Sequence, residues 1–131
     1  MKIFHYISFV VIILLLAGLC VLEEVVVSTS LKDVQSACFE LEKTLDEKET
    51  LKTMDVVLKV DNLESMWGED EGTLCYMVNH KNVQEIGQEI AKLKMYIKED
   101  DVPAFNVSLQ QIQFYCRGYL HFMGASIHNV L

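Results

Sequence analysis

The feature that most constrains the fold is an apolar stretch near the N-terminus, residues 3–22, which contains no charged side chain. It lies between Lys2 and the pair Glu23-Glu24. As an α-helix, this stretch would measure about 30 Å, the thickness of the hydrocarbon core of a bilayer. A secretory signal has a shorter apolar core, of roughly 7–15 residues. We therefore predict an uncleaved transmembrane anchor over residues 1–24, in contact with the lipid bilayer through residues 3–22.

Two alternatives compete with the uncleaved anchor. A cleaved signal peptide needs a small-x-small cleavage site, and the best candidate, around residues 28–30, lies beyond two glutamates. A lipoprotein would use Cys20, but the bulky Leu19 just before this cysteine is a poor fit. The flanking charges then set the orientation. Because Lys2 precedes the span and glutamates follow it, the positive-inside rule predicts a cytoplasmic N-terminus and a domain of residues 25–131 outside the cell membrane.

Charge is distributed unevenly along the rest of the chain. All 19 carboxylates lie between Glu23 and Asp101, whereas Arg117 is the only formally charged side chain from Val102 onward. The formal net charge of −8 disfavours binding to nucleic acid and to anionic lipid head groups. One proline and six glycines argue against a sandwich or barrel, which needs many turns. We therefore expect no nucleic acid among the partners.

Hydrophobic spacing predicts two helices directly after the anchor. The first follows residues 28–30, which contain no helix breaker, so the anchor should continue into it. The second runs through residues 51–67 towards Leu74, and a break or kink at residues 68–72 is left open. Their apolar positions are Leu31, Val34, Cys38, Leu41 and Leu45 in the first helix, and Leu51, Met54, Val57, Leu58, Met66 and Trp67 in the second.

The third and fourth helices have recognisable starts. Asn82, with Glu85 three residues later, resembles a capping box, and Asp101 before Pro103 can cap the next helix. The apolar seams are Val83, Ile86, Ile90, Leu93 and Ile97, and then Phe105, Leu109, Ile112, Cys116, Leu120, Met123 and Ile127. The fourth helix also has aromatic side chains that cannot all share one stripe with Phe105: Phe114, Tyr115, Tyr119 and Phe122. This excess predicts a central position in the bundle or, alternatively, a face for a partner or the membrane surface.

The connections define the architecture. Short joints near residues 46–50, 79–82 and 99–102 imply antiparallel neighbours. We therefore predict an all-α protein, in which an N-terminal transmembrane helix continues into an up-down bundle of three to four helices. The two domains are the anchor, residues 1–24, and an extracytoplasmic helical bundle, residues 25–131.

Residue types that carry chemistry are present but lack catalytic spacing. Cys38 and Cys116 lie on apolar seams, where a free cysteine behaves as a small buried hydrophobe, and a disulfide between them is the alternative. His121 and His128 are seven residues apart, but the Glu-x-x-His pairs of metal-binding bundles do not occur. There is no nucleophile elbow or phosphate-binding loop. We expect no enzyme activity, no cofactor and no metal.

Several short segments carry a family resemblance. They are Trp67, the pair Asn79-His80, the run IAKLKMYI at residues 90–97, and residues 129–131. With one apolar segment followed by a helical domain, the chain resembles the bacterial family known as domain of unknown function four-three-six-three. The resemblance implies this topology and an origin in spore-forming Gram-positive bacteria. The family has no established activity, so the resemblance implies no mechanism, and Asn79 stands where an Asp is commoner.

These observations favour function by association over catalysis. Only a few residues would face the cytoplasm, so we expect the protein to act laterally on another membrane or envelope protein, with a homo-oligomer as a further option. The alternative is an extracytoplasmic sensor or carrier that binds a small molecule in an aromatic pocket. The candidate residues for a partner surface or pocket are Trp67, Tyr76, Tyr96, Tyr115, Tyr119 and Phe122.

Overall fold

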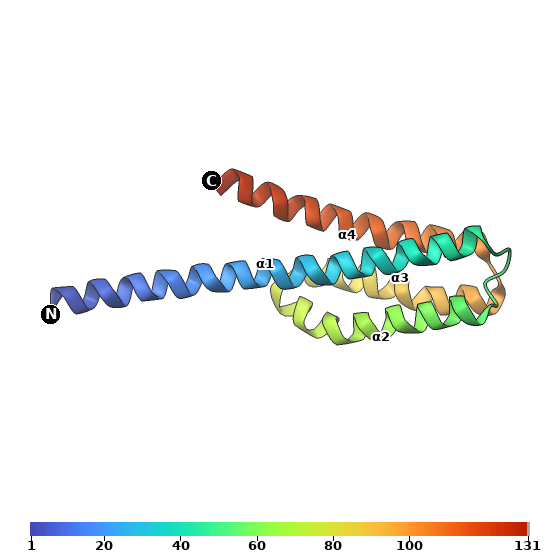
Figure 1. Ribbon diagram of the computed structural model, residues 1–131, viewed down its shortest axis with the longest axis horizontal. Helices are drawn as coiled ribbons and strands as arrows, with labels where there is room; N and C mark the ends of the chain where they lie inside the picture. Colours follow the sequence, from blue (N-terminus) through green and yellow to red (C-terminus); the bar gives the residue numbers. More distant parts are fainter. Residues whose placement is uncertain (131) are drawn as a thin grey trace.

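The computed structural model describes the backbone of residues 1–130 and the side chains of residues 1–124. This part of the chain forms four helices and no strand: α1 (Lys2–Asp46), α2 (Met54–Met77), α3 (His80–Glu99) and α4 (Val102–Val130). Successive helices run in opposite directions (Figure 1). The prediction of an all-α, up-down bundle entered by a long apolar N-terminal helix is therefore confirmed.

The four helices pack as a ring. α1 contacts α2, α2 contacts α3, α3 contacts α4, and α4 returns to α1, while no diagonal pair is in contact over the described residues. α4 thus has two neighbours, as each other helix has, and the prediction of a central position for it is wrong. Its additional apolar side chains face outward instead, since Phe114 and Phe122 are 63% and 76% exposed.

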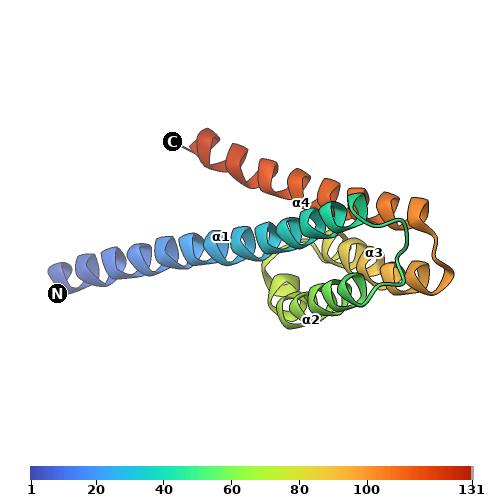
Figure 2. The same ribbon diagram turned by 45° about the vertical axis from the view of Figure 1, so that its right-hand side comes forward.

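α1 is one continuous helix of 45 residues whose two parts have different surroundings. Most of the apolar segment, residues 3–22, projects beyond the bundle (Figures 1 and 2), and its side chains are exposed. Burial begins at Val27 and follows the predicted seam from Leu31 to Leu45. Residues 28–30 are helical, so the predicted continuation of the apolar segment into the bundle is confirmed.

α2 begins later than predicted and has no break. It starts at Met54, so Leu51 lies in the preceding loop, where its side chain is fully buried. Residues 68–72 are helical, which excludes a loop there. The predicted seam is confirmed at Leu51 and Trp67, which are buried, but it is wrong at Met54 and Leu58, which face outward. The buried positions repeat at intervals of three, four and seven residues instead: Val56, Val60, Leu63, Trp67 and Leu74.

α3 begins before the predicted capping residue. Asn79 is the N-cap, and its side chain accepts a hydrogen bond from the amide of Lys81 at 2.9 Å. Asn82 is already inside the helix, since its amide donates to the carbonyl of Asn79. The predicted capping of α4 by Asp101 is confirmed, because the Asp101 carboxylate accepts a hydrogen bond from the amide of Ala104 at 3.0 Å.

The loop of residues 47–53 and the turn at residues 100–101 lie side by side at one end of the bundle (Figures 1 and 2). Asp100 joins them, because its carboxylate accepts hydrogen bonds from the amide of Leu51 at 2.8 Å and from the hydroxyl of Thr50 at 2.9 Å. These bonds hold the pKa of Asp100 below its ordinary value, the Leu51 amide contributing most. The contact closes the end of the bundle over Leu51.

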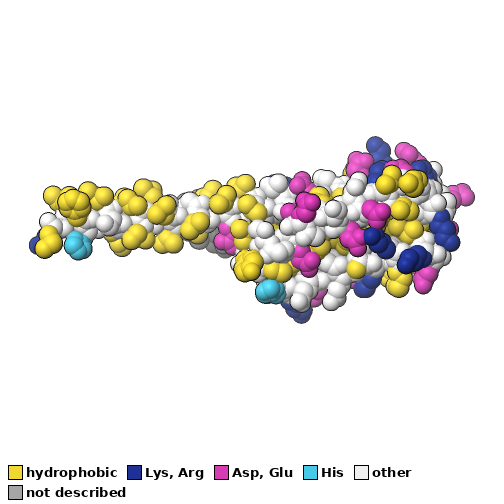
Figure 3. Space-filling view, turned by 90° about the horizontal axis from the view of Figure 1, so that it is seen from below, with side chains coloured by type: hydrophobic (Ala, Val, Ile, Leu, Met, Phe, Trp, Pro, Cys, Tyr) yellow, Lys and Arg dark blue, Asp and Glu magenta, His cyan; other side chains and the backbone are white. Residues whose placement is uncertain are grey.

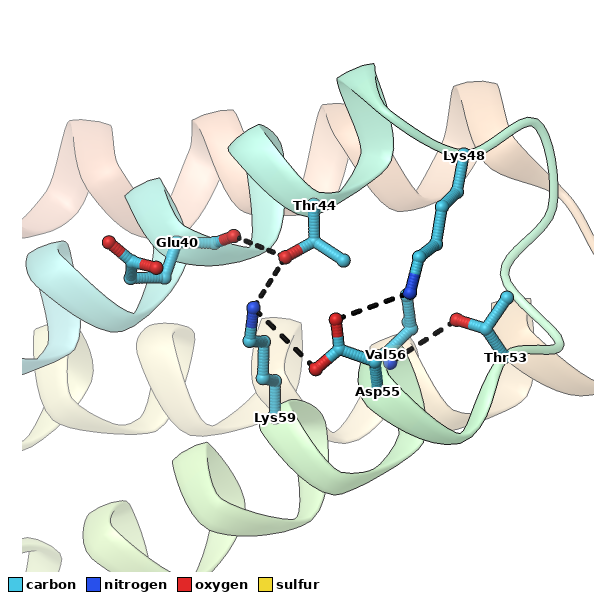
Figure 4. A network of polar contacts seen from close by, with 7 residues as sticks. All are labelled: Glu40, Thr44, Lys48, Thr53, Asp55, Val56 and Lys59. Carbon is cyan, nitrogen blue, oxygen red and sulfur yellow. Dashed lines mark hydrogen bonds and ion pairs between the residues drawn. The ribbon is translucent and has the colours of Figure 1, made fainter.

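A polar network joins α1 to α2 near the same end (Figure 4). The hydroxyl of the buried Thr44 donates to the carbonyl of Glu40 at 2.8 Å and accepts from Lys59 Nζ at 2.5 Å. Asp55 lies 3.7 Å from the Lys59 ammonium and 3.3 Å from that of Lys48. The Thr44 hydroxyl is thus satisfied as donor and acceptor, which removes the cost of burying it.

Candidate functional site

The predicted aromatic residues do not gather in one pocket. Tyr76, at the end of α2, is 94% exposed, and Phe122, on α4, is also exposed. Trp67 is buried beside α3. The remaining three are half-buried against the core: Tyr96, Tyr115 and Tyr119. The candidate residues therefore belong to several separate surfaces.

Trp67 lines a surface groove between α2 and α3. Its indole Nε1 is buried and has no hydrogen-bond partner among the described residues. A Cβ on Gly87 would lie 3.0 Å from this nitrogen and 3.4 Å from a carboxylate oxygen of Glu71, so the indole sits directly against the α3 backbone. The groove has a volume of about 480 Å³ and is lined by Glu64, Trp67, Gly68, Glu71, Gln84, Gly87, Gln88, Ile90 and Ala91. Its polar rim suits a hydrogen-bonding ligand.

A second groove, of about 200 Å³, lies where α4 separates from α1. Its lining comes from α1 around the point where burial begins, from the C-terminal end of α2 with its capping residue, and from the C-terminal half of α4. The residues are Cys20, Glu23, Glu24, Val27, Met77, Val78, Tyr119 and Met123. Tyr119 and Met123 therefore lie beside the boundary between the apolar segment and the bundle.

The outer face of α4 carries an apolar ridge, which we define as Val107, Phe114 and Gly118. Val107 and Phe114 are 66% and 63% exposed, and a Cβ on Gly118 would meet nothing within 4 Å. Steps of seven and four residues place the three on one helix face, opposite the buried seam. Sequence reasoning singled out Phe114 but missed Val107, for which the spacing to Phe114 was the available signal. A separate groove, between α1 and α4, is lined by Gln35, Ser36, Phe39, Glu40 and Gln113.

Charged side chains are concentrated on the bundle, while hydrophobic ones surround the projecting part of α1 (Figure 3). Lys94 of α3 forms ion pairs with Asp61, at 3.0 Å, and Glu64 of α2. Lys92 lies 2.6 Å from Glu89, and the hydrogen bond between them raises the pKa of the Lys92 ammonium. In contrast, α4 carries no carboxylate and one formally charged side chain, Arg117, while the three residues of the α4 ridge are themselves uncharged.

All four cysteines are free, so the alternative of a bridge between Cys38 and Cys116 is not formed. Burial raises the pKa of Cys116 to about 12 and raises that of Cys38 further, which disfavours the reactive thiolate. Within the described residues, no group of three or more His, Cys, Asp or Glu side chains comes close enough to hold a metal ion.

The segments that carried the family resemblance have structural roles where their side chains are described. Trp67 packs against Gly87, and Asn79 caps α3. The side chains of Ile127 and His128, like those of residues 129–131, lie outside the described part of the chain.

Comparison with known proteins gives one match. No curated protein and no solved structure matches the chain. One family model matches residues 22–130, from the last apolar residue of the N-terminal stretch to the end of α4. Because this match covers most of the chain, the protein belongs to the family described as Domain of unknown function (DUF4363), as the resemblance implied.

Proposed function

We propose that this chain is a single-pass, membrane-anchored helical protein that acts by associating with another membrane or envelope protein. The observation that carries the proposal is the continuity of α1. Its residues 3–22 are uncharged and exposed, and the same helix enters the bundle core at Val27. An exposed apolar helix surface of this length requires lipid or protein to cover it, and its length matches a bilayer.

The unbroken helix also determines what the bundle can reach. A continuous α-helix is stiff compared with a flexible linker, so the bundle would remain close to the membrane surface. With the N-terminus in the cytoplasm, as the flanking charges favour, the bundle would lie outside the cell membrane. Partners would then be proteins in the same membrane or in the adjacent envelope.

The α4 ridge is the surface that we propose for this association. Exposed aromatic and apolar side chains without charge are typical of the core of a protein interface, whereas the charged faces of α2 and α3 are better solvated. Phe114 is the central anchor of the ridge, and the exposed Gly118 allows a partner helix to approach the backbone.

A photo-crosslinking experiment in native membranes tests this proposal. The full chain carries p-benzoylphenylalanine in place of Val107 and, as a matched control, in place of the exposed Ser65 on α2, across the ring from α4. We expect a light-dependent adduct with a specific membrane protein from Val107 only. Phe114→Glu should abolish this adduct, because it places a charge in the apolar contact, whereas Ser65→Glu should leave it intact.

The other outcomes of this experiment are informative as well. An adduct of twice the mass of the chain would identify a homo-oligomer as the associated species. The absence of any adduct from Val107, or equal adducts from Val107 and Ser65, would contradict association through the α4 ridge. Extraction of the full chain from membranes by alkaline carbonate would contradict the anchor itself.

A second candidate function has one observation in its favour, the unpartnered Nε1 of Trp67 in a polar-rimmed groove. A buried N–H without an acceptor is costly, and a small molecule with an acceptor group would satisfy it. Addition of such a ligand should change the fluorescence of Trp67, which is the only tryptophan. Gly87→Ala would place a methyl group against the indole and should weaken this response.

A further inference from the structure

The C-terminal part of α4 extends towards the level of the apolar segment of α1 while it diverges from α1 (Figures 1 and 2). Tyr119 and Met123 line the same groove as Cys20 and Glu24, which mark the upper end of that segment. α4 runs antiparallel to α1 and continues beyond Met123 to Val130, in the direction of the N-terminus of α1 (Figures 1 and 2). Those last seven residues add about 10 Å of helix.

If α1 spans a membrane, the position of α4 along α1 places the C-terminal part of α4 near the surface of the bilayer. The upper boundary of the hydrocarbon region would lie near Leu22, where the apolar segment ends before the glutamates. The part of α4 from Tyr119 to Val130 would then lie at the level of the head groups and the upper acyl chains. The head-group region on each side of the hydrocarbon core is about 5–8 Å thick, so the roughly 10 Å of helix beyond Met123 is long enough to cross it.

The residue types in this part of α4 agree with that position. From Gly118 to the end of the sequence there is no Asp, Glu, Lys or Arg. Phe122 is 76% exposed although the bundle core is close, and Tyr119 combines an apolar ring with a polar tip. Aromatic side chains of this kind are enriched at the membrane–water interface. By contrast, all carboxylates of the chain lie between Glu23 and Asp101, on the parts that would face water.

We propose that the end of α4, from Tyr119 to Val130, inserts into the head-group and upper acyl region of the leaflet that the bundle faces. This inference rests on the proposed anchor in α1. Lipid would then hold the protein at two points, the span in α1 and the end of α4. Such a two-point attachment fixes the rotation of the bundle about α1, and therefore fixes which face of the bundle a lateral partner meets.

Depth-dependent fluorescence quenching tests the insertion. The full chain is reconstituted in phosphatidylcholine vesicles whose acyl chains are brominated, with Trp67→Phe in every variant so that one tryptophan remains. Phe122→Trp reports on the end of α4. Phe114→Trp is the matched control, because it replaces an exposed phenylalanine on the same helix about 12 Å further from the membrane. Leu16→Trp reports on the apolar segment.

We expect strong quenching and a blue-shifted emission for Leu16→Trp and Phe122→Trp, with quenching of Phe122→Trp about twofold or more that of Phe114→Trp. His121→Trp, on the same exposed turn, provides a second reading, and far-ultraviolet circular dichroism verifies the helix content of each variant. Only the purified chain is present, so quenching requires lipid contact.

The results separate the two proposals. If Leu16→Trp is quenched but Phe122→Trp and His121→Trp are no more quenched than Phe114→Trp, the inserted α4 end is overturned and the anchor stands. This same result is expected if the natural function of the α4 end is to bind a protein, because lipid alone would then not contact Phe122→Trp. If Leu16→Trp is not quenched, the anchor is overturned, and the insertion that rests on it is overturned too.

Discussion

Asp100 has two separate roles at the end of the bundle. Its φ of 56° is the left-handed conformation, which Gly, Asn and Asp adopt more readily than other residues. Its carboxylate joins two loops through Leu51 and Thr50. We expect Asp100→Asn to adopt the left-handed conformation and to keep one side-chain acceptor for the Leu51 amide. Asp100→Gly should adopt the same conformation but has no acceptor, and Asp100→Ala should have neither advantage. The urea midpoint of the full chain in detergent should fall furthest for Asp100→Ala, and equal midpoints for all three variants would contradict these roles.

The same carboxylate predicts a pH dependence of stability. Hydrogen bonds, first from the Leu51 amide and then from Thr50, lower the pKa of Asp100 in the folded state. A lowered folded pKa stabilises the fold above the unfolded pKa, and this stability is lost as the pH falls through the folded value. The stability difference between wild type and Asp100→Asn should therefore be complete above about pH 4 and shrink below it. Urea titrations over this range measure it, and a pH-independent difference would contradict the expectation.

The three thiols outside the apolar segment should differ in reactivity towards a water-soluble reagent. Cys38 and Cys116 are fully buried with raised pKa values, about 12 for Cys116, so few thiolates are present near neutral pH. Cys75 is only half-buried. We expect a water-soluble maleimide to label Cys75 in the folded chain, and to label Cys38 and Cys116 only after unfolding in urea. Peptide mass spectrometry identifies the labelled sites. Labelling of Cys38 or Cys116 at the rate of Cys75 would show that the core opens locally.

At the scale of helices, α2 and α3 pack closely because Gly87 faces the Trp67 indole. Gly87→Ala gains up to about 1 kcal/mol of helix propensity, but overpacking of a buried contact costs about 1–3 kcal/mol. With Cβ only 3.0 Å from Nε1 and Trp67 only 3% exposed, we expect a net loss of about 1 kcal/mol in the free energy of unfolding.

Gly72→Ala, on α2, is the control for this prediction. A Cβ at Gly72 meets nothing within 4 Å, so the variant should be about 0.5–1 kcal/mol more stable than wild type. Thermal unfolding of the full chain, followed by circular dichroism, measures both variants. A stabilising effect of Gly87→Ala equal to that of Gly72→Ala would show that the indole moves aside at little cost.

The sequence predicted helices better than it predicted their starts and faces. Apolar spacing identified the seams of α1 and α3 because their charged residues occupy the opposite face. In α2, apolar residues lie on several faces, and the ring arrangement decided which of them, such as Val56, is buried and which, such as Leu58, is exposed. Asn79 and Asn82 are both suitable N-caps, and the extended backbone at Asn79 determined which is used.

The candidate surfaces were predictable only in part, because a surface depends on which helices are neighbours. Phe114 and Phe122 were recognisable as excess aromatic residues, but their exposure follows from the position of α4 in the ring. The groove at Trp67 depends on Gly87 in another helix, a pairing that neither residue indicates alone.

At the scale of the whole molecule, the helix–helix core and the apolar segment occupy different parts of the chain. Among the side chains that the structure describes, the buried ones extend from Val27 to Cys116, whereas residues 3–22 are all exposed. The bundle should therefore not require the anchor for its stability. The domain boundary after residue 24 stays a prediction, and truncation can test it directly.

We expect a chain of residues 25–131 to unfold cooperatively within a few degrees of the full chain, because it keeps the whole core. A chain of residues 35–131 is the control. It lacks Val27, Leu31 and Val34, whose burial contributes about 1.5–3 kcal/mol each, a large share of the 5–15 kcal/mol typical of a domain. The shorter chain should therefore lose its thermal transition in circular dichroism. If residues 25–131 also unfold without cooperativity, the apolar segment stabilises the bundle, and anchor and bundle form one folding unit.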